Sequence, residues 1–184
     1  MDYRPIVAYV ILIAVCRYSE SIVSLRTGSW KKKPKWDWTF PLVVVPFILV
    51  IVCPVLEYLY RESRHGPISY ATGGCLLLAA TFLRTKGHLD LKKGFSMFIE
   101  KVEGQELVET GLYRHIRHPL YLGTACMFLG CPVFLAAYRS LGWSLLGLLS
   151  LYVRIRKEEQ FLLKHMPGYK EYRKRTWALI PKVF

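Results

Sequence analysis

The sequence predicts an all-α, polytopic integral membrane protein with about five transmembrane helices. Two observations carry this prediction. Of the 184 residues, 53% are hydrophobic, yet the formal net charge is +13. The cations are concentrated between long apolar runs, as expected when apolar helices cross a bilayer and basic loops stay on one side.

Five apolar runs are the candidate spans. A helix needs about 20 residues to cross about 30 Å of hydrocarbon, because each residue adds about 1.5 Å. The runs cover residues 5–25, 38–60, 68–83, 119–138 and 141–155, and the second contains LVVVPFILVIVCPVL. Only Arg139 and Ser140 separate the last two runs, so we expect these to form an antiparallel helical hairpin.

The cations predict the orientation. Of 26 Lys and Arg residues, five lie between the first two runs, seven between the third and fourth, and nine from Arg154 to the C-terminus. The positive-inside rule then places the N-terminus outside and the C-terminus in the cytoplasm, which requires an odd number of spans. Topology and contact with anionic lipid account for the charge, so nucleic-acid binding is not expected.

The cysteines and the N-terminal run support two further expectations. All five cysteines fall inside or at the ends of apolar runs without CxxC spacing, so we expect neither a metal site nor a disulfide. The first run lacks a basic n-region and an A-x-A-like exit, so no cleavable signal peptide is expected. Within that run, Arg17 and Glu20 stand at i,i+3 and form either an ion pair facing the bundle or a wall of a polar cavity.

Polar residues also gather at the ends of the last two runs. Pro119 fits the first turn of a helix, whose free N–H groups suit an anionic group, and Arg117 and His118 precede it. They follow a cytoplasmic stretch, 84–118, that is too long for a simple connection. Beyond the fifth run, Arg154 and Glu158 share a helix face, while Glu159 points about 100° away.

These polar residues have a structural and a functional interpretation. Arg117 and His118 could be interfacial anchors, and Arg154 with Glu158 could be a weak surface ion pair. The hairpin, however, brings the start of the fourth helix and the end of the fifth to one membrane face. Two carboxylates beside arginine and histidine at that face can hold a zwitterionic or cationic cofactor.

Four motifs carry a family resemblance. They are LVETGLY at 107–113, RHPLY at 117–121, Arg154 followed by the Glu158–Glu159 pair, and GYKEY at 168–172. Together they resemble the isoprenylcysteine carboxyl methyltransferase family and its phospholipid N-methyltransferase relatives, over about half of the chain. The Arg17-x-x-Glu20 pattern is similar to that of bacterial members.

The resemblance implies S-adenosylmethionine as methyl donor, in a cytoplasmic pocket capped by the 84–118 loop and the C-terminal segment. A lipophilic acceptor would enter laterally from the bilayer. Arg154 would position this acceptor and, with Glu158, is the predicted catalytic residue. The chain would form one membrane methyltransferase domain, with three spans in 1–83 and the catalytic core in 84–184. The implied cofactor-binding residues are Leu107, Tyr113, Arg117, His118, Tyr121, Glu158 and Glu159.

Several acceptors and activities stay open. We expect the carboxylate of an isoprenylated cysteine or a similar amphiphile, because an arginine such as Arg154 holds a carboxylate by two parallel hydrogen bonds. A phospholipid amine, as in phosphatidylethanolamine, and a small thiol are alternatives. Membrane sterol reductases, which bind NADPH, share a similar C-terminal architecture but tend to carry an Asp and a Lys-Cys element in place of Glu158–Glu159. A non-enzymatic scaffold would leave the clustered Arg, His and Glu unexplained.

The expected location follows from this interpretation. The protein would be a multi-pass membrane protein whose active site faces the cytoplasm, in the inner membrane of a bacterium or the endoplasmic reticulum of a eukaryote. Its partners would be a lipophilic or prenylated substrate and membrane lipid, with no obligate protein partner and no metal.

Overall fold

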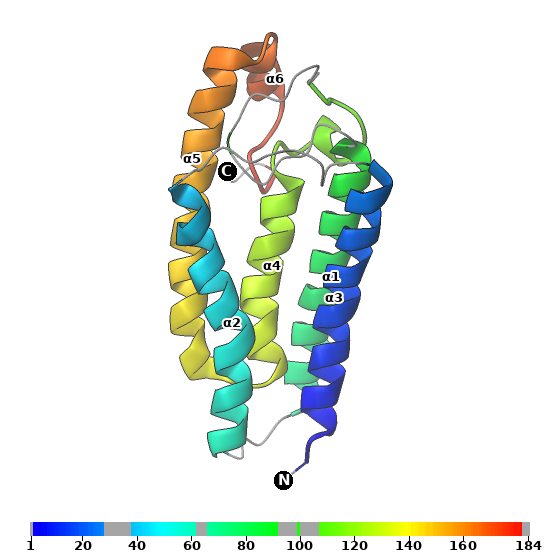
Figure 1. Cartoon of the computed structure of the whole chain (residues 1–184), viewed down its shortest axis with the longest axis vertical. Coiled ribbons are helices and arrows are strands. Elements are labelled where there is room, and N and C mark those ends of the chain that lie inside the picture. Colours follow the sequence, from blue (N-terminus) through cyan, green and yellow to red (C-terminus); the bar gives the residue numbers. More distant parts are fainter. Residues whose placement is uncertain (1, 28–37, 62–65, 92–98, 100–106, 182–184) are drawn as a thin grey trace.

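The computed structural model describes residues 2–27, 38–61, 66–91, 99 and 107–181, and these form an antiparallel helical bundle (Figure 1). The predicted all-α class is confirmed. Two 3-10 helices, η3 (Gly111–Arg114) and η4 (Tyr138–Ser140), and the short helix α6 (Tyr169–Arg175) accompany the long helices. The long helices, which run in alternating directions, are α1 (Arg4–Thr27), α2 (Thr39–Arg61), α3 (Pro67–Leu91), α4 (Pro119–Phe134) and α5 (Leu141–His165).

Helices α1 and α2 match the predicted bounds within two residues, but the other three differ. Helix α3 continues to Leu91, so the prediction that residues 84–91 belong to a loop was wrong. Helix α4 ends at Phe134 rather than at residue 138, because the chain turns through Ala136, whose φ is 46°. Helix α5 runs to His165, since the charged residues that follow its apolar part are themselves good helix formers.

The predicted hairpin of the last two long helices is present. Helices α4 and α5 are antiparallel, so the start of α4 and the end of α5 lie at the same end of the bundle (Figure 1). At the opposite end, the Glu57 carboxylate of α2 accepts the backbone N–H groups of Arg139 (3.2 Å) and Ser140 (2.9 Å). Because helix starts leave N–H groups unpaired, this carboxylate satisfies the start of α5 and fixes α2 to the hairpin.

Glycines allow the closest approach between helices, which is that of α3 and α4. A Cβ atom on Gly73 would overlap the backbone of Phe134, and one on Gly123 would overlap the Arg84 side chain. Small residues let two helix backbones approach closely, which is a common means of helix association in membranes. The result here is that Arg84 of α3 reaches Thr124 of α4 and donates to its hydroxyl.

The outer surface of the bundle is apolar. Among the described residues, α1 and α2 are long and apolar enough to cross a membrane, and α4 is a shorter apolar helix. An exposed apolar surface of this extent marks contact with lipid or with another protein. The large apolar side chains exposed on α1 and α2 include Val7, Val10, Ile11, Val15, Val45, Ile48, Val52 and Leu56.

Candidate active site

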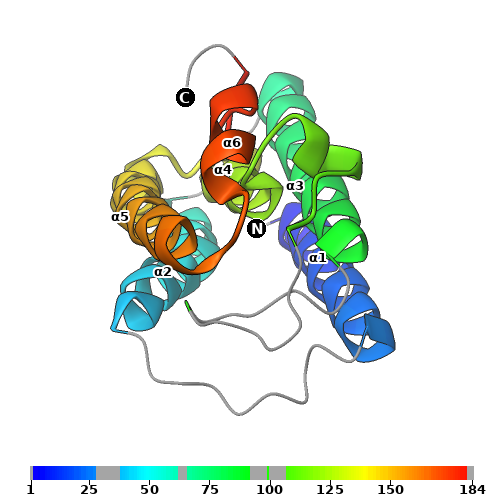
Figure 2. The ribbon, with the colours of Figure 1, turned by 90° about the horizontal axis from the view of Figure 1, so that it is seen from above.

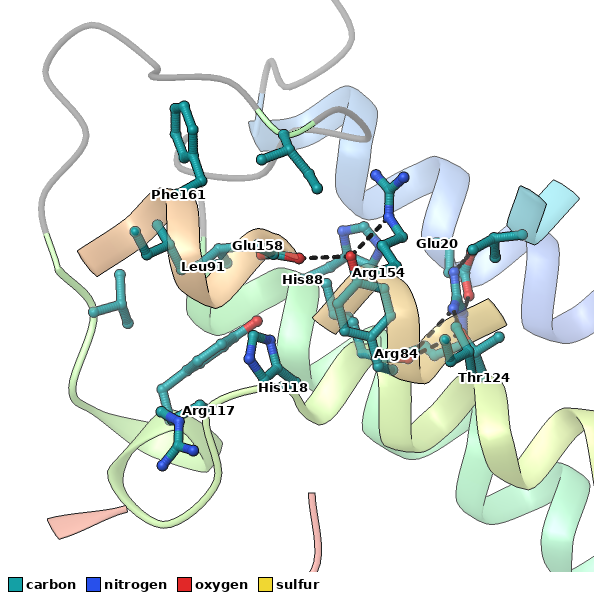
Figure 3. Close-up of a pocket in the computed structure, with 18 of the residues that line it drawn as sticks. Glu20, Arg84, His88, Leu91, Arg117, His118, Thr124, Arg154, Glu158 and Phe161 are labelled. Atoms are coloured by element: carbon teal, nitrogen blue, oxygen red, sulfur yellow. Dashed lines mark hydrogen bonds and ion pairs between the residues drawn. The ribbon is translucent and has the colours of Figure 1, made fainter. Parts of the chain in front are cut away.

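A cavity of about 480 Å³ lies at the end of the bundle where α1, α3 and α5 end and α2 and α4 begin. Ligand pockets in proteins usually measure about 300–1,000 Å³. Side chains of all five long helices line this cavity, and Figure 3 shows that polar groups from α1, α3, α4 and α5 converge on it. Its ionisable and tyrosine side chains are Arg17, Glu20, Arg84, His88, Tyr113, Arg117, His118, Tyr121, Arg154, Glu158, Tyr169 and Tyr172.

The Tyr121 hydroxyl connects Arg154 to Glu158. Arg154 Nε donates to Tyr121 Oη over 2.9 Å, and this hydroxyl donates to Glu158 Oε2 over 2.6 Å. Arg154 is buried, and its Nη1 donates over 2.9 Å to Oγ1 of Thr39 in the first turn of α2. Arg154 and Glu158 therefore face the cavity together, as their spacing predicts.

Glu159 lies behind the cavity rather than among its lining residues. Its Oε1 atom accepts a 2.8 Å hydrogen bond from Arg117 Nε and lies 3.5 Å from His118 Nε2. Figure 3 shows the guanidinium of Arg117 directed away from Glu158. Glu159 and Arg117 thus support the wall that carries His118, and a direct contact of Glu159 with a cofactor stays a prediction.

The pKa of Glu159 reflects this pairing. Glu159 lies four residues beyond the predicted span 141–155, at the cytoplasmic end that the charge pattern predicts. Burial raises the pKa of its carboxyl, but His118 and Arg117 lower it more, so the pKa falls from 4.5 to about 2. The carboxylate is therefore charged at any pH at which the protein is studied.

The segment after α6 holds the residues in front of α4 in place. The backbone N–H groups of Arg117 and His118 donate to the carbonyls of Trp177 (2.8 Å) and Ala178 (3.0 Å), and Trp177 N donates to His115 O (3.1 Å). Tyr172 of α6 donates from its hydroxyl to the Tyr113 carbonyl over 2.7 Å. The C-terminal segment thereby borders the cavity, as the resemblance implies.

Two buried polar atoms at the cavity have no hydrogen-bond partner in the described part of the chain. They are Nε2 of His118 and the hydroxyl oxygen of Tyr169, in residues that are 5% and 2% exposed. An unpaired buried polar group costs about 1–3 kcal/mol, so native proteins usually pair such groups with protein, ligand or water. His118 Nε2 faces Glu159 Oε1 at 3.5 Å, whereas Tyr169 lines the cavity, so its hydroxyl is open to a polar ligand there.

The wall of the cavity that α2 forms is apolar. Phe40, Val43, Val44 and Phe47 of α2 line it, opposite Arg17 and Glu20 of α1. The 2.7 Å ion pair between Arg17 Nη1 and Glu20 Oε2 also forms part of this wall. The two interpretations of Arg17 and Glu20, an ion pair and a wall of a polar cavity, therefore hold together.

Most of the residues predicted from the motifs lie together at this cavity, and the polar residues that were missed include Arg84, His88 and Thr39. Leu107, Tyr113, Arg117, His118, Tyr121, Arg154 and Glu158 line it. Sequence reasoning used Arg84 only as a topological cation and did not consider His88 or Thr39. Arg84 and His88 could have been identified from the sequence, because they follow the apolar run 68–83. No sequence pattern singles out Thr39.

Comparison with known proteins decides the family. The sequence model of the isoprenylcysteine carboxyl methyltransferase (ICMT) family matches residues 73–164, which is half of the chain. The chain belongs to this family. The match includes α4 and most of α5, and with them Arg117, His118, Tyr121, Arg154 and Glu158.

Two curated relatives agree by name with the family assignment, and a third has a different name. The protein-S-isoprenylcysteine O-methyltransferase of Dictyostelium discoideum is 33% identical over 88 residues, which are 46% of this chain and 36% of that protein. The enzyme of the same name from Saccharomyces cerevisiae is 30% identical over 142 residues, 72% of this chain and 59% of that protein. The nickel-cobalt-cadmium resistance protein NccN of Alcaligenes xylosoxydans xylosoxydans is 31% identical over 96 residues, 48% of this chain and 42% of that protein. The chain thus spans less than two thirds of each of these relatives.

A solved structure confirms the fold. The eukaryotic intramembrane Ras methyltransferase ICMT superposes with a TM-score of 0.75 over 98% of this chain and 67% of that chain, at 20% sequence identity. The two chains therefore share the helical arrangement of the family, including the part of the bundle outside residues 73–164.

Proposed function

We propose that this chain is an S-adenosylmethionine-dependent methyltransferase that acts on the carboxylate of an isoprenylated cysteine or a similar amphiphile. The observation that carries the proposal is the connected set Glu158–Tyr121–Arg154 in one cavity that has a polar end and an apolar wall. Membership of the ICMT family and the names of two relatives support the enzyme class.

The polar end of the cavity suits the cofactor. S-adenosylmethionine supplies a methyl group on a positively charged sulfur, and it also carries an ammonium group and a carboxylate. Glu158 offers a negative charge to the cationic groups, while the Tyr169 hydroxyl offers unused hydrogen-bonding capacity. The proposed cofactor residues are those of the motifs: Leu107, Tyr113, Arg117, His118, Tyr121 and Glu158, with Glu159 acting through Arg117.

The charge of the cavity lining supports an anionic acceptor. Among the described residues, four arginines line it (Arg17, Arg84, Arg117, Arg154) with two glutamates (Glu20, Glu158), and Glu159 behind the wall pairs with Arg117. The described lining therefore carries more positive than negative charge, which suits an acceptor carboxylate. A phospholipid amine, the runner-up acceptor, would be repelled by that charge and would need a base to accept its proton.

The chain's own residues then act by orientation. Methyl transfer to a carboxylate is an in-line displacement that needs no proton transfer, so holding the reactants and excluding water account for catalysis. Arg154 is buried, and its bonds to Thr39 and Tyr121 fix its guanidinium, so it can hold the acceptor carboxylate in a defined direction.

Direct binding distinguishes this proposal from the reductase alternative. We expect the purified protein in lipid nanodiscs to bind S-adenosylmethionine in titration calorimetry and to give no measurable heat with NADPH. The Glu158–Glu159 pair motivates this expectation. Preferential binding of NADPH would contradict the methyltransferase proposal and favour a reductase.

We also propose that α1–α5 each cross the membrane, with the N-terminus outside and the C-terminus in the cytoplasm. The alternating helix directions support this topology, and so does the alternation of basic segments along the sequence. Much of that charge, in 28–37 and 92–106, lies outside the described residues. Reporters fused to the two ends should be found on opposite sides of the membrane; reporters on the same side would refute the topology.

A further inference from the structure

We propose that Arg17 selects acceptors by their negative charge, at the side of the cavity between α1 and α2. The inference rests on the proposed function, because it assigns a second contact to the same acceptor. Arg17 differs from the buried Arg154 in that its side chain is 47% exposed, although it too lines the cavity.

The first step is the charge around Glu20, which has two guanidinium partners. Arg17 Nη1 lies 2.7 Å from Glu20 Oε2, and Arg84 Nη2 lies 3.1 Å from the same oxygen. Arg84 is only 14% exposed and also donates to Thr124 Oγ1 and to the Leu120 carbonyl. One carboxylate neutralises one cation, so the remaining charge lies with the accessible partner, Arg17. A net cation at membrane depth is costly unless it meets an anion.

The second step is the position of Arg17 between two walls. Helix α1 packs chiefly on α3, and α2 packs chiefly on α5 (Figure 2). Arg17 extends from α1 toward α2, where its Cζ atom lies 5.6 Å from the ring centroid of Phe47 in a cation–π contact. Both side chains line the cavity, so an amphiphile between α1 and α2 meets the apolar wall of α2 with its tail and Arg17 with its head.

The chemical class of ligand follows from these two steps. It is a single-headed amphiphile with one negative charge and a long apolar tail, since Arg17 shares its counter-ion Glu20 with Arg84 and faces an apolar wall. Methylation of a carboxylate removes its charge, so the ester product has less affinity for Arg17 than the substrate has. The same contact therefore favours entry of the acid and release of the ester.

Binding in the absence of cofactor tests this inference. The probes are N-acetyl-S-farnesylcysteine and its primary amide, which has the same tail without the charge, titrated into the protein in nanodiscs of zwitterionic lipid. We expect the acid to bind about tenfold more tightly than the amide, since hydrogen bonds to charged groups are worth this much. Arg17→Gln should reduce the difference to the part that Arg154 supplies, and Arg17→Lys should keep more of it. The matched control is Arg26→Gln, an exposed position on α1 away from the cavity, which should keep all of it.

Each outcome bears on Arg17. An acid-to-amide ratio that is unchanged in Arg17→Gln, or absent in the wild type, would overturn the inference. Equal loss of acid and amide together with lost S-adenosylmethionine binding would show a structural role and would overturn it as well. Methyl transfer, measured in parallel, separates the two proposals: an Arg17-dependent preference without transfer supports the role of Arg17 and contradicts the proposed function. Methyl transfer together with an acid-over-amide preference that does not depend on Arg17 supports the proposed function and contradicts the role of Arg17.

Discussion

Replacing Arg154 by lysine is expected to lower kcat by about 100-fold or more, because removing a preorganised charged donor at a reaction centre has effects of this size. Lysine keeps the charge, but it lacks the planar fork and the bonds that fix Arg154 to Tyr121 and Thr39. The affinity for S-adenosylmethionine should stay close to that of the wild type. The measurement is steady-state methyl transfer to a farnesylcysteine acceptor, with cofactor affinity measured by calorimetry.

The matched control is Arg156→Lys, two residues further along α5. Arg156 is exposed, with its guanidinium over the ring of Tyr152, and does not line the cavity, so this variant should behave like the wild type. If Arg154 merely set the geometry of Glu158 through Tyr121, cofactor affinity would fall in step with kcat. That parallel loss would remove Arg154 from acceptor binding.

Replacing the two adjacent glutamates is expected to change different properties, namely cofactor affinity for Glu158 and folding stability for Glu159. Glu158→Ala should weaken S-adenosylmethionine binding by about 10- to 100-fold while the protein stays folded, because it removes a charged hydrogen-bond acceptor that faces the cavity. Glu159→Ala should instead lower the free energy of unfolding by about 3 kcal/mol, because Arg117 would keep a buried, unpaired charge. Calorimetry with the cofactor and thermal unfolding in detergent separate the two effects.

The same two measurements can be applied to His118→Ala and to the pH dependence of stability. His118→Ala removes a side chain that lines the cavity and should weaken cofactor binding in the same direction as Glu158→Ala. The pKa of Glu159 is lowered to about 2, so its stabilising contribution is full above pH 4.5 and is lost as the pH falls toward 2. Unchanged cofactor affinity in both Glu158→Ala and His118→Ala would exclude these residues from the pocket.

The parts of this fold that the sequence predicts are those fixed by local patterns. Long apolar runs predict α1 and α2 within two residues, because the membrane sets the length of a span. The four-residue spacing of Arg154 and Glu158 predicts their shared face, and the separation of Glu159 from that face is also observed. Pro119 stands at the first position of α4, as expected for a proline that needs no N–H partner.

The parts that were missed depend on partners distant in the sequence. Arg84 reaches Glu20, 64 residues away, because α1 packs on α3, and no local pattern records that packing. The contact of Thr39 with Arg154 joins residues 115 positions apart. The assignment of Glu159 to the cofactor rests on the resemblance, which gives residue types at motif positions but not the direction of each side chain, and it stays a prediction.

The central claim is that this cavity transfers a methyl group from S-adenosylmethionine to an acceptor carboxylate. The most direct test incubates the purified protein, in nanodiscs that contain phosphatidylethanolamine, with methyl-labelled S-adenosylmethionine and N-acetyl-S-farnesylcysteine. The account predicts label in the farnesylcysteine as an ester that mild base releases as methanol, and a large decrease of that signal in Arg154→Lys. Base-stable label in phosphatidylethanolamine, with none in the farnesylcysteine, would contradict the carboxylate assignment.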